Sequence, residues 1–84
     1  MNPRKTLELI LPGSRNIRFT DFARLVEAFG FRLSRVSGSH HIFSRPGLIE
    51  AINLQDYHGE AKPYQIRQFL RLVEKYGLKF EKRP

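Results

Sequence analysis

The sequence contains no cysteine and no long apolar run. The lack of cysteine excludes a disulfide framework, thiolate metal sites and a cysteine nucleophile, and it fits a reducing cytosol. The longest uninterrupted apolar run covers residues 9–11. It is far shorter than the ~18 residues that a membrane-spanning helix needs, and also too short for the core of a signal peptide. We therefore expect a cytoplasmic protein with no membrane segment.

The chain is also short, because 84 residues are enough for one domain only. Its hydrophobic fraction is 40%, with seven Phe and three Tyr, which is sufficient for a modest core and argues against disorder. A two-domain enzyme with its own cofactor domain is excluded, and we expect no small-molecule cofactor.

Acidic residues are scarce: eight Asp and Glu stand against fifteen Lys and Arg, a net charge of +7. Such an excess attracts a nucleic acid, an anionic membrane or an acidic protein, and the ten arginines favour nucleic acid because guanidinium pairs with phosphate. The net charge is +4 over residues 1–37, −2 over 38–61 and +5 over 62–84. We therefore expect the two ends of the chain to form the basic surface.

Periodicity predicts a short helix over residues 4–11, interrupted by residues 12–14, and a clearer helix over 20–29. Thr20 is the expected N-cap of this helix, and Gly30 is the expected C-terminal glycine. The apolar residues of this helix share one face: Phe22, Leu25, Val26 and Phe29.

Three strands are expected over residues 31–36, 40–44 and 48–54, joined by turns at 37–39 and 45–47 and followed by a polar connection over 55–61. A last helix is expected from Pro63 to Tyr76 and ends at Gly77. Its apolar face is Ile66, Phe69, Leu70, Val73 and Tyr76, and Arg67, Arg71 and Lys75 form a basic ridge beside it. The fold class is therefore α+β, with the order α-β-β-β-α, both helices on one face of an antiparallel sheet, and the other face open to a ligand.

Of the three histidines, His40 and His41 are adjacent at the start of a strand and point to opposite faces. They cannot easily share a metal ion, and His58 near Asp56 matches no metal-binding spacing, so no metal site is expected. His40 follows Gly38 and Ser39, whose backbone N–H groups can approach a phosphate closely. Because imidazole titrates near neutral pH, His40 is a candidate acid–base group for RNA cleavage, where the ribose 2′-OH is the nucleophile.

A run of residues 30–43, Gly-Phe, a strand and then Gly-Ser-His-His-Ile-Phe, resembles the HicA toxin family of small ribonucleases. The resemblance covers about residues 19–78. It implies a fold like that of a double-stranded-RNA-binding domain, which agrees with the order predicted from periodicity. It further implies that His40 is catalytic, that Gly38 matters for activity, and that a HicB antitoxin covers the active surface. It assigns no role to His41 or His58.

The sequence differs from the family pattern in two places, at residues 52–55 and 61–68, and about eighteen residues precede the first family helix. We expect an N-terminal extension over 1–18, a HicA-like domain over 19–80 and a tail over 81–84. Leu7, Leu9, Ile10 and Leu11 indicate that the extension packs against the core.

The leading hypothesis is the toxin of a type II toxin–antitoxin system, a metal-independent endoribonuclease that cleaves mRNA through His40, with Gly38 and Ser39 shaping the approach to the phosphate. Two alternatives remain: a module of the same fold that binds RNA without cutting it, and an inactive homologue that binds an antitoxin. A bulge at Gly38 would change which arginines share a face with His40. The candidate RNA contacts are Arg32, Arg35, Arg45, Arg67 and Arg71.

Overall fold

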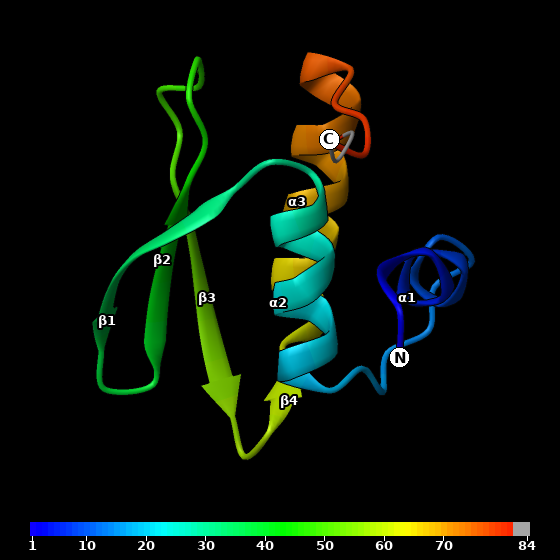
Figure 1. Cartoon of the computed structure of the whole chain (residues 1–84). Coiled ribbons are helices and arrows are strands. Elements are labelled where there is room, and N and C mark those ends of the chain that lie inside the picture. The colour runs from blue at the N-terminus through cyan, green and yellow to red at the C-terminus, as the bar shows by residue number, and fades with distance from the viewer. Residues whose placement is uncertain (82–84) are drawn as a thin grey trace.

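The computed structural model describes residues 1–81. Its elements are α1 (Pro3–Ile10), α2 (Phe19–Ala28), β1 (Arg32–Ser37), β2 (His40–Ser44), β3 (Ile52–Tyr57), β4 (Glu60–Ala61) and α3 (Pro63–Tyr76). The four strands form one antiparallel sheet in the order β1-β2-β3-β4 (Figure 1). The predicted α+β class is confirmed, and the chain adds α1 ahead of the α-β-β-β-α order and the short strand β4 within it.

The molecule is layered: α2 and α3 cover one face of the sheet, and α1 lies on the outer side of α2 (Figure 1). The core lies between the sheet and the two covering helices. Phe69 of α3 is at its centre, in edge-to-face contact with Phe22, Phe29 and Phe31 at centroid distances of 5.6, 5.5 and 6.2 Å. The opposite face of the sheet has no helix over it in the described part of the chain, so its side chains are open to a ligand.

Helix α2 begins one residue earlier than predicted, and the prediction of Thr20 as its N-cap is wrong. The N-cap is Arg18, which makes no side-chain capping bond. The backbone explains the difference, because the Phe19 N–H donates to Gly59 O at 2.9 Å and Arg18 bridges Glu60 of β4. Pairing with β4 therefore satisfies a donor at the helix entrance that a capping side chain would otherwise serve. Gly30 follows the helix with φ +93°, as its predicted role as C-terminal glycine requires.

The third strand is the main correction. It covers Ile52–Tyr57 instead of residues 48–54, and residues 58–59 then turn the chain into β4. Ile52 and Leu54 are buried under the helices, whereas Asn53 is exposed on the other face. Only one face of this strand is covered by helices, so its last residues, 55–57, can be polar. A sequence of polar residues resembles a loop, which is why the prediction ended the strand too early. Residues 48–51 form a loop instead, and the Tyr76 hydroxyl at the end of α3 donates to the Glu50 carboxylate there.

The predicted short helix in the extension is confirmed as α1, which ends before Pro12 and Gly13. Ile10 is fully buried against the core and Leu7 is partly buried, whereas Leu9 and Leu11 are exposed. Most of the predicted tail lies outside the described residues, and Glu81 is the one residue of it that the structure covers. Between residues 1 and 81, no helix is long and apolar enough to span a membrane.

Candidate active site

The turn between β1 and β2 is tight, as predicted. Ser37 pairs with His40, so the loop consists of Gly38 and Ser39 alone. Gly38 has φ +58° and Ser39 does not have a positive φ, which is the pattern of a type II′ hairpin turn with glycine in its first central position. A Cβ at Gly38 would meet no atom within 4 Å, so the backbone conformation and not crowding requires glycine here. The turn delivers His40 to the first position of β2.

The His40 imidazole lies exposed on the uncovered face of the sheet. Its Nδ1 is 3.2 Å from the amide oxygen of Asn53 on β3. Because an amide oxygen only accepts, Nδ1 carries the proton in this contact and the lone pair of the neutral ring is on Nε2. The contact with Asn53 orients the ring, and in the tautomer with the proton on Nδ1 the Nε2 atom can accept a proton from a substrate.

Strand register identifies the residues that share this face. His40 lies opposite Ser37 on β1 and opposite Gln55 on β3. The register shift in β1 lies between Leu33 and Arg35 and not at Gly38, so Arg35 pairs with Ile42. Ile42 shares the face of His40 because side chains alternate along β2, so Arg35 is a diagonal neighbour of His40, at the ~7–8 Å that such pairs span.

His41 points to the other face and has a structural environment. Its ring is partly buried against Phe19, with centroids 4.7 Å apart, and its Nδ1 donates to Ser39 O at 3.1 Å. The prediction that the two histidines point apart is therefore confirmed. Among residues 1–81 no group of three or more Asp, Glu or His side chains is arranged to hold a metal ion.

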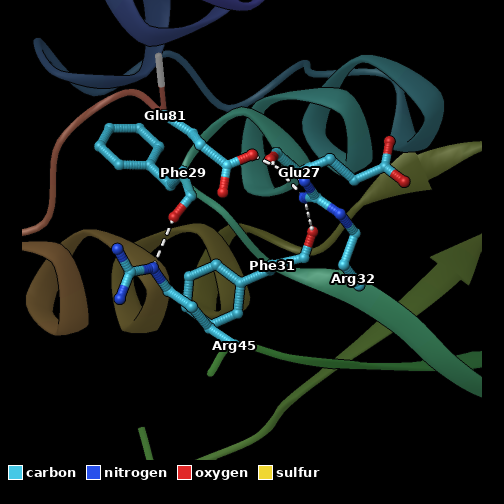
Figure 2. Close-up of polar contacts among 6 residues, drawn as sticks. All are labelled: Glu27, Phe29, Phe31, Arg32, Arg45 and Glu81. Atoms are coloured by element: carbon cyan, nitrogen blue, oxygen red, sulfur yellow. Dashed lines mark hydrogen bonds and ion pairs between the residues drawn. The ribbon is translucent and has the colours of Figure 1, made fainter. Parts of the chain in front are cut away.

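Arg32 and Arg45 are both held at the C-terminal end of α2 (Figure 2). Arg45 Nε donates to Phe29 O at 2.8 Å, and Arg32 donates to Phe31 O at 2.8 Å. Arg32 also forms an ion pair with Glu81 at 2.6 Å. Cations at a helix C-terminus satisfy carbonyls that lack partners and oppose the helix dipole. These two guanidinium groups therefore join α2 to the sheet.

The remaining predicted arginines, Arg67 and Arg71, are exposed on α3. Helix α3 lies on the covered face of the sheet, so these two side chains and His40 belong to opposite layers of the molecule (Figure 1). Of the five candidate arginines, the structure brings Arg35 alone beside His40 on the uncovered face.

Sequence reasoning missed Asn53 and Gln65. Gln65, at the start of α3, is buried, and its side-chain amide makes the hydrogen bonds to β3 that a neighbouring strand would otherwise make. Its Oε1 accepts from Gln55 N at 2.9 Å, and its Nε2 donates to Asn53 O at 3.0 Å. Polar alternation between Ile52 and Leu54 is a signal that could have placed Asn53 on the exposed face, once the strand had been assigned correctly. No local sequence signal indicates the contact of Gln65, because it depends on how α3 docks.

His58 occupies the turn between β3 and β4, and its ring packs edge-on against the Tyr57 ring at a centroid distance of 4.6 Å. It has φ +52°, the one positive φ at a non-glycine position among the described residues, and Gly59 follows with φ +85°. Two successive positive φ values in a two-residue hairpin form a type I′ turn, which the Gly59 N–H stabilises by donating to the Asp56 carboxylate at 2.8 Å.

Comparison of the chain with known proteins identifies the family to which it belongs. A family model described as the HicA toxin of bacterial toxin–antitoxin systems matches residues 19–81. No curated protein and no solved structure gives a significant match to the chain. The matched residues run from the first residue of α2 through the candidate site to the end of the described chain, and so include the whole sheet and both covering helices. The chain therefore belongs to the HicA toxin family, which is described as toxins of bacterial toxin–antitoxin systems.

Proposed function

We propose that this toxin is a metal-independent endoribonuclease that cleaves mRNA, with His40 as the group that moves the proton. The observation that carries the proposal is the hydrogen bond from His40 Nδ1 to Asn53, at 3.2 Å, on the uncovered face of the sheet. It leaves Nε2 exposed and able to accept a proton. A histidine oriented by a second side chain, next to a glycine turn in a basic protein, is an arrangement suited to phosphate chemistry.

One histidine acting as a general base is enough for this reaction. His40 Nε2 takes the proton from a ribose 2′-OH, the 2′ oxygen attacks the adjacent phosphorus, and the bond to the 5′ oxygen breaks. The products are a 2′,3′-cyclic phosphate and a 5′-OH end, whose proton comes from solvent. RNA supplies its own nucleophile, so the chemistry needs no activated water.

Arg35 is the proposed contact to the scissile phosphate, because it is diagonal to His40 on the same face. A guanidinium there would stabilise the charge that develops on the phosphoryl oxygens. Gly38 and Ser39 would shape the approach, since the turn has no side chain at its first position. Arg67 and Arg71 are proposed to contact more distant parts of an RNA, and Arg32 and Arg45 to hold α2 in place near the site.

The family membership implies an antitoxin partner. We propose a HicB-like protein that blocks the toxin by covering the face that carries His40. The net charge of +7 favours an acidic surface on that partner.

The test is induced expression in a bacterial host, with RNA cleavage mapped in the same cells. The parent chain should arrest growth and cut mRNA, and His40→Ala should do neither while remaining folded. The matched control is Gln68→Ala, which removes a neutral, exposed side chain on α3, in the layer opposite to His40 (Figure 1). Cleavage that persists in His40→Ala would refute the role of His40. Growth arrest and cleavage that are absent from the parent chain would refute the enzyme and leave an RNA-binding or antitoxin-binding protein.

A further inference from the structure

A second candidate site lies at the C-terminal end of β3, where Tyr57 leads into the turn to β4. It is an open cleft of about 480 Å³ between residues 15–16, β4 and the start of α3. The side chains that give it chemical character are two tyrosines, two cations, one amide and one carboxylate: Tyr57, Tyr64, Arg15, Lys62, Asn16 and Glu60. None of these residues belongs to the site built around His40.

The aromatic rings of this cleft are accessible. Tyr57 is 51% exposed and Tyr64 is 47% exposed, although both belong to a small domain whose other large aromatic groups are mostly buried. The Lys62 ammonium lies over the Tyr57 ring, 4.9 Å from its centroid, and the His58 ring makes an edge contact with Tyr57 at a centroid distance of 4.6 Å. The remaining exposed part of the ring, together with this cation, can hold a base and the phosphate attached to that base.

The cleft is connected to His40 through β3. Gln55 of β3 lies opposite His40, and Tyr57 follows two residues later on the same strand. Strand β3 therefore runs from the site of His40 to the cleft. Gln65 forms a second connection: its Nε2 donates to Asn53 O at 3.0 Å and to the Tyr64 hydroxyl at 3.4 Å. The Tyr64 hydroxyl is therefore beside the residue that orients His40.

We propose that this cleft is a subsite for an unpaired nucleotide of single-stranded RNA, next to the phosphate at which the chain is cut. The base stacks on Tyr57, its phosphate contacts Lys62 and Arg15, and the Glu60 carboxylate accepts a hydrogen bond from an amino group of the base. Stacking on a side chain requires a base that has left its helix, so the subsite selects single strands. A fold like that of a double-stranded-RNA-binding domain would otherwise favour duplex by shape alone. The choice of substrate class rests on the proposed nuclease function.

The test measures binding to an RNA analogue that cannot be cleaved. The probe is a fluorescein-labelled 2′-O-methyl octanucleotide of mixed sequence, which lacks the 2′-OH nucleophile, used as a single strand and annealed to its complement. Affinity is measured by anisotropy on the full chain, and stacking is measured by quenching of tyrosine emission, which is visible because the chain has no Trp. The parent should bind the single strand more tightly than the duplex, with quenched emission.

Tyr57→Ala should weaken single-strand binding about 5- to 150-fold, the range that corresponds to loss of one base–aromatic stack, whereas Tyr57→Phe should bind like the parent. The matched control is Tyr76→Ala, an exposed tyrosine at the other end of α3 that should leave affinity unchanged. Lys62→Gln should lower the slope of log affinity against log salt by about 0.7, which tests the cleft without removing an aromatic ring.

Tighter binding of the duplex, or equal affinities of Tyr57→Ala and the parent, would overturn the subsite. The same variants are then assayed for cleavage of ordinary RNA. A parent chain that binds the probe through Tyr57 and cuts no RNA would support the subsite and refute the nuclease. A parent that cuts RNA and binds independently of Tyr57 and Lys62 would do the reverse.

Discussion

At the scale of single residues, the most informative contact is the one between His40 and Asn53. It joins the neighbouring strands β2 and β3, and it turns the Nδ1 side of the imidazole toward Asn53. Asn53 touches no reacting atom in the proposed chemistry, so it is a positioning residue. Its effect should therefore be visible in catalysis and in the pH dependence of the rate.

Asn53→Ala should reduce the rate of RNA cleavage about 2- to 10-fold, because a neutral hydrogen bond that orients the base contributes ~0.5–1.5 kcal/mol. Asn53→Asp keeps an acceptor and adds a negative charge that favours the imidazolium. Its rate should recover at alkaline pH, with the acidic limb of the pH–rate profile moved to higher pH. Both profiles can be measured with a fluorogenic RNA. Identical profiles for the parent and Asn53→Asp would contradict the positioning role.

Arg45 illustrates a residue whose sequence-based interpretation and structural environment differ. The sequence places it in a turn of a basic protein, where an RNA contact is a natural hypothesis. In the structure its Nε donates to Phe29 O, and a Cβ at Gly30 would lie only 2.9 Å from the same atom. Packing of this kind depends on the chain coming together in three dimensions, so no local pattern could have indicated it.

Arg45→Ala should lower the free energy of unfolding by about 1.5–3 kcal/mol, the usual value for a hydrogen bond that involves a charged group. Urea denaturation followed by circular dichroism measures it. Arg67→Ala, an exposed arginine on α3, should change stability by less than about 0.5 kcal/mol. Similar stabilities for the two variants would mean that the contact at the end of α2 contributes little.

At the scale of elements, the two strongly periodic helices were predicted almost to the residue, and the strands less well. Helix α3 starts at Pro63 and ends before Gly77, because proline and glycine act locally at helix ends. The strand β2 also has its predicted bounds. The start of β3 was misplaced because Leu48 and Ile49 are apolar, yet Ile49 is fully exposed in the loop. Burial, which depends on tertiary structure, decided that boundary.

The contact of Gln65 with β3 gives a prediction about an element. β4 pairs only with residues 56–57, so the outer edge of β3 near Gln55 relies on the Gln65 amide. Gln65→Leu would leave one N–H and one C=O without a partner, and it should destabilise the fold by ~2–4 kcal/mol. Hydrogen exchange at the Gln55 amide should accelerate more than exchange in β1–β2 pairs. Unchanged protection at Gln55 would show that Gln65 does not serve this edge.

At the scale of the whole molecule, the Glu50 carboxylate joins the β2–β3 loop to the end of α3. The Tyr76 hydroxyl donates to it, and Lys75 Nζ is 3.5 Å away. The hydroxyl contact first, and the Lys75 charge after it, hold the pKa of Glu50 below its usual value of 4.5. A carboxyl whose pKa is lower in the folded state stabilises the fold above its ordinary pKa and loses this contribution as the pH falls through the lowered value.

Tyr76→Phe should therefore raise the pKa of Glu50, and the difference in stability between Tyr76→Phe and the parent should shrink as the pH falls below 4.5. Titration of the Glu50 carboxyl by NMR measures the first effect, and denaturation at pH 7 and pH 3 measures the second. A pKa that does not move in Tyr76→Phe would remove the hydroxyl as its cause.

The distribution of charge also changes meaning at this scale. The sequence predicts basic ends around a slightly acidic middle, and the structure places the basic ridge of α3 and the candidate base on opposite layers (Figure 1). The acidic middle includes Glu60, which lines the cleft between β4 and the start of α3, and Glu50, which anchors a loop. An RNA that engages both layers must therefore pass around an edge of the sheet, and the cleft at β4 and the start of α3 lies at one such edge.

Cleavage of a defined RNA by the purified chain tests whether His40 moves the proton. Purified parent chain, His40→Ala and Gln68→Ala should be incubated with one defined RNA in the presence of a chelator, and the ends of the products analysed by mass spectrometry. The parent and Gln68→Ala should yield fragments with 2′,3′-cyclic phosphate and 5′-OH ends, and folded His40→Ala should leave the RNA intact. Intact RNA in all three reactions, or identical fragments from His40→Ala, would contradict that role of His40.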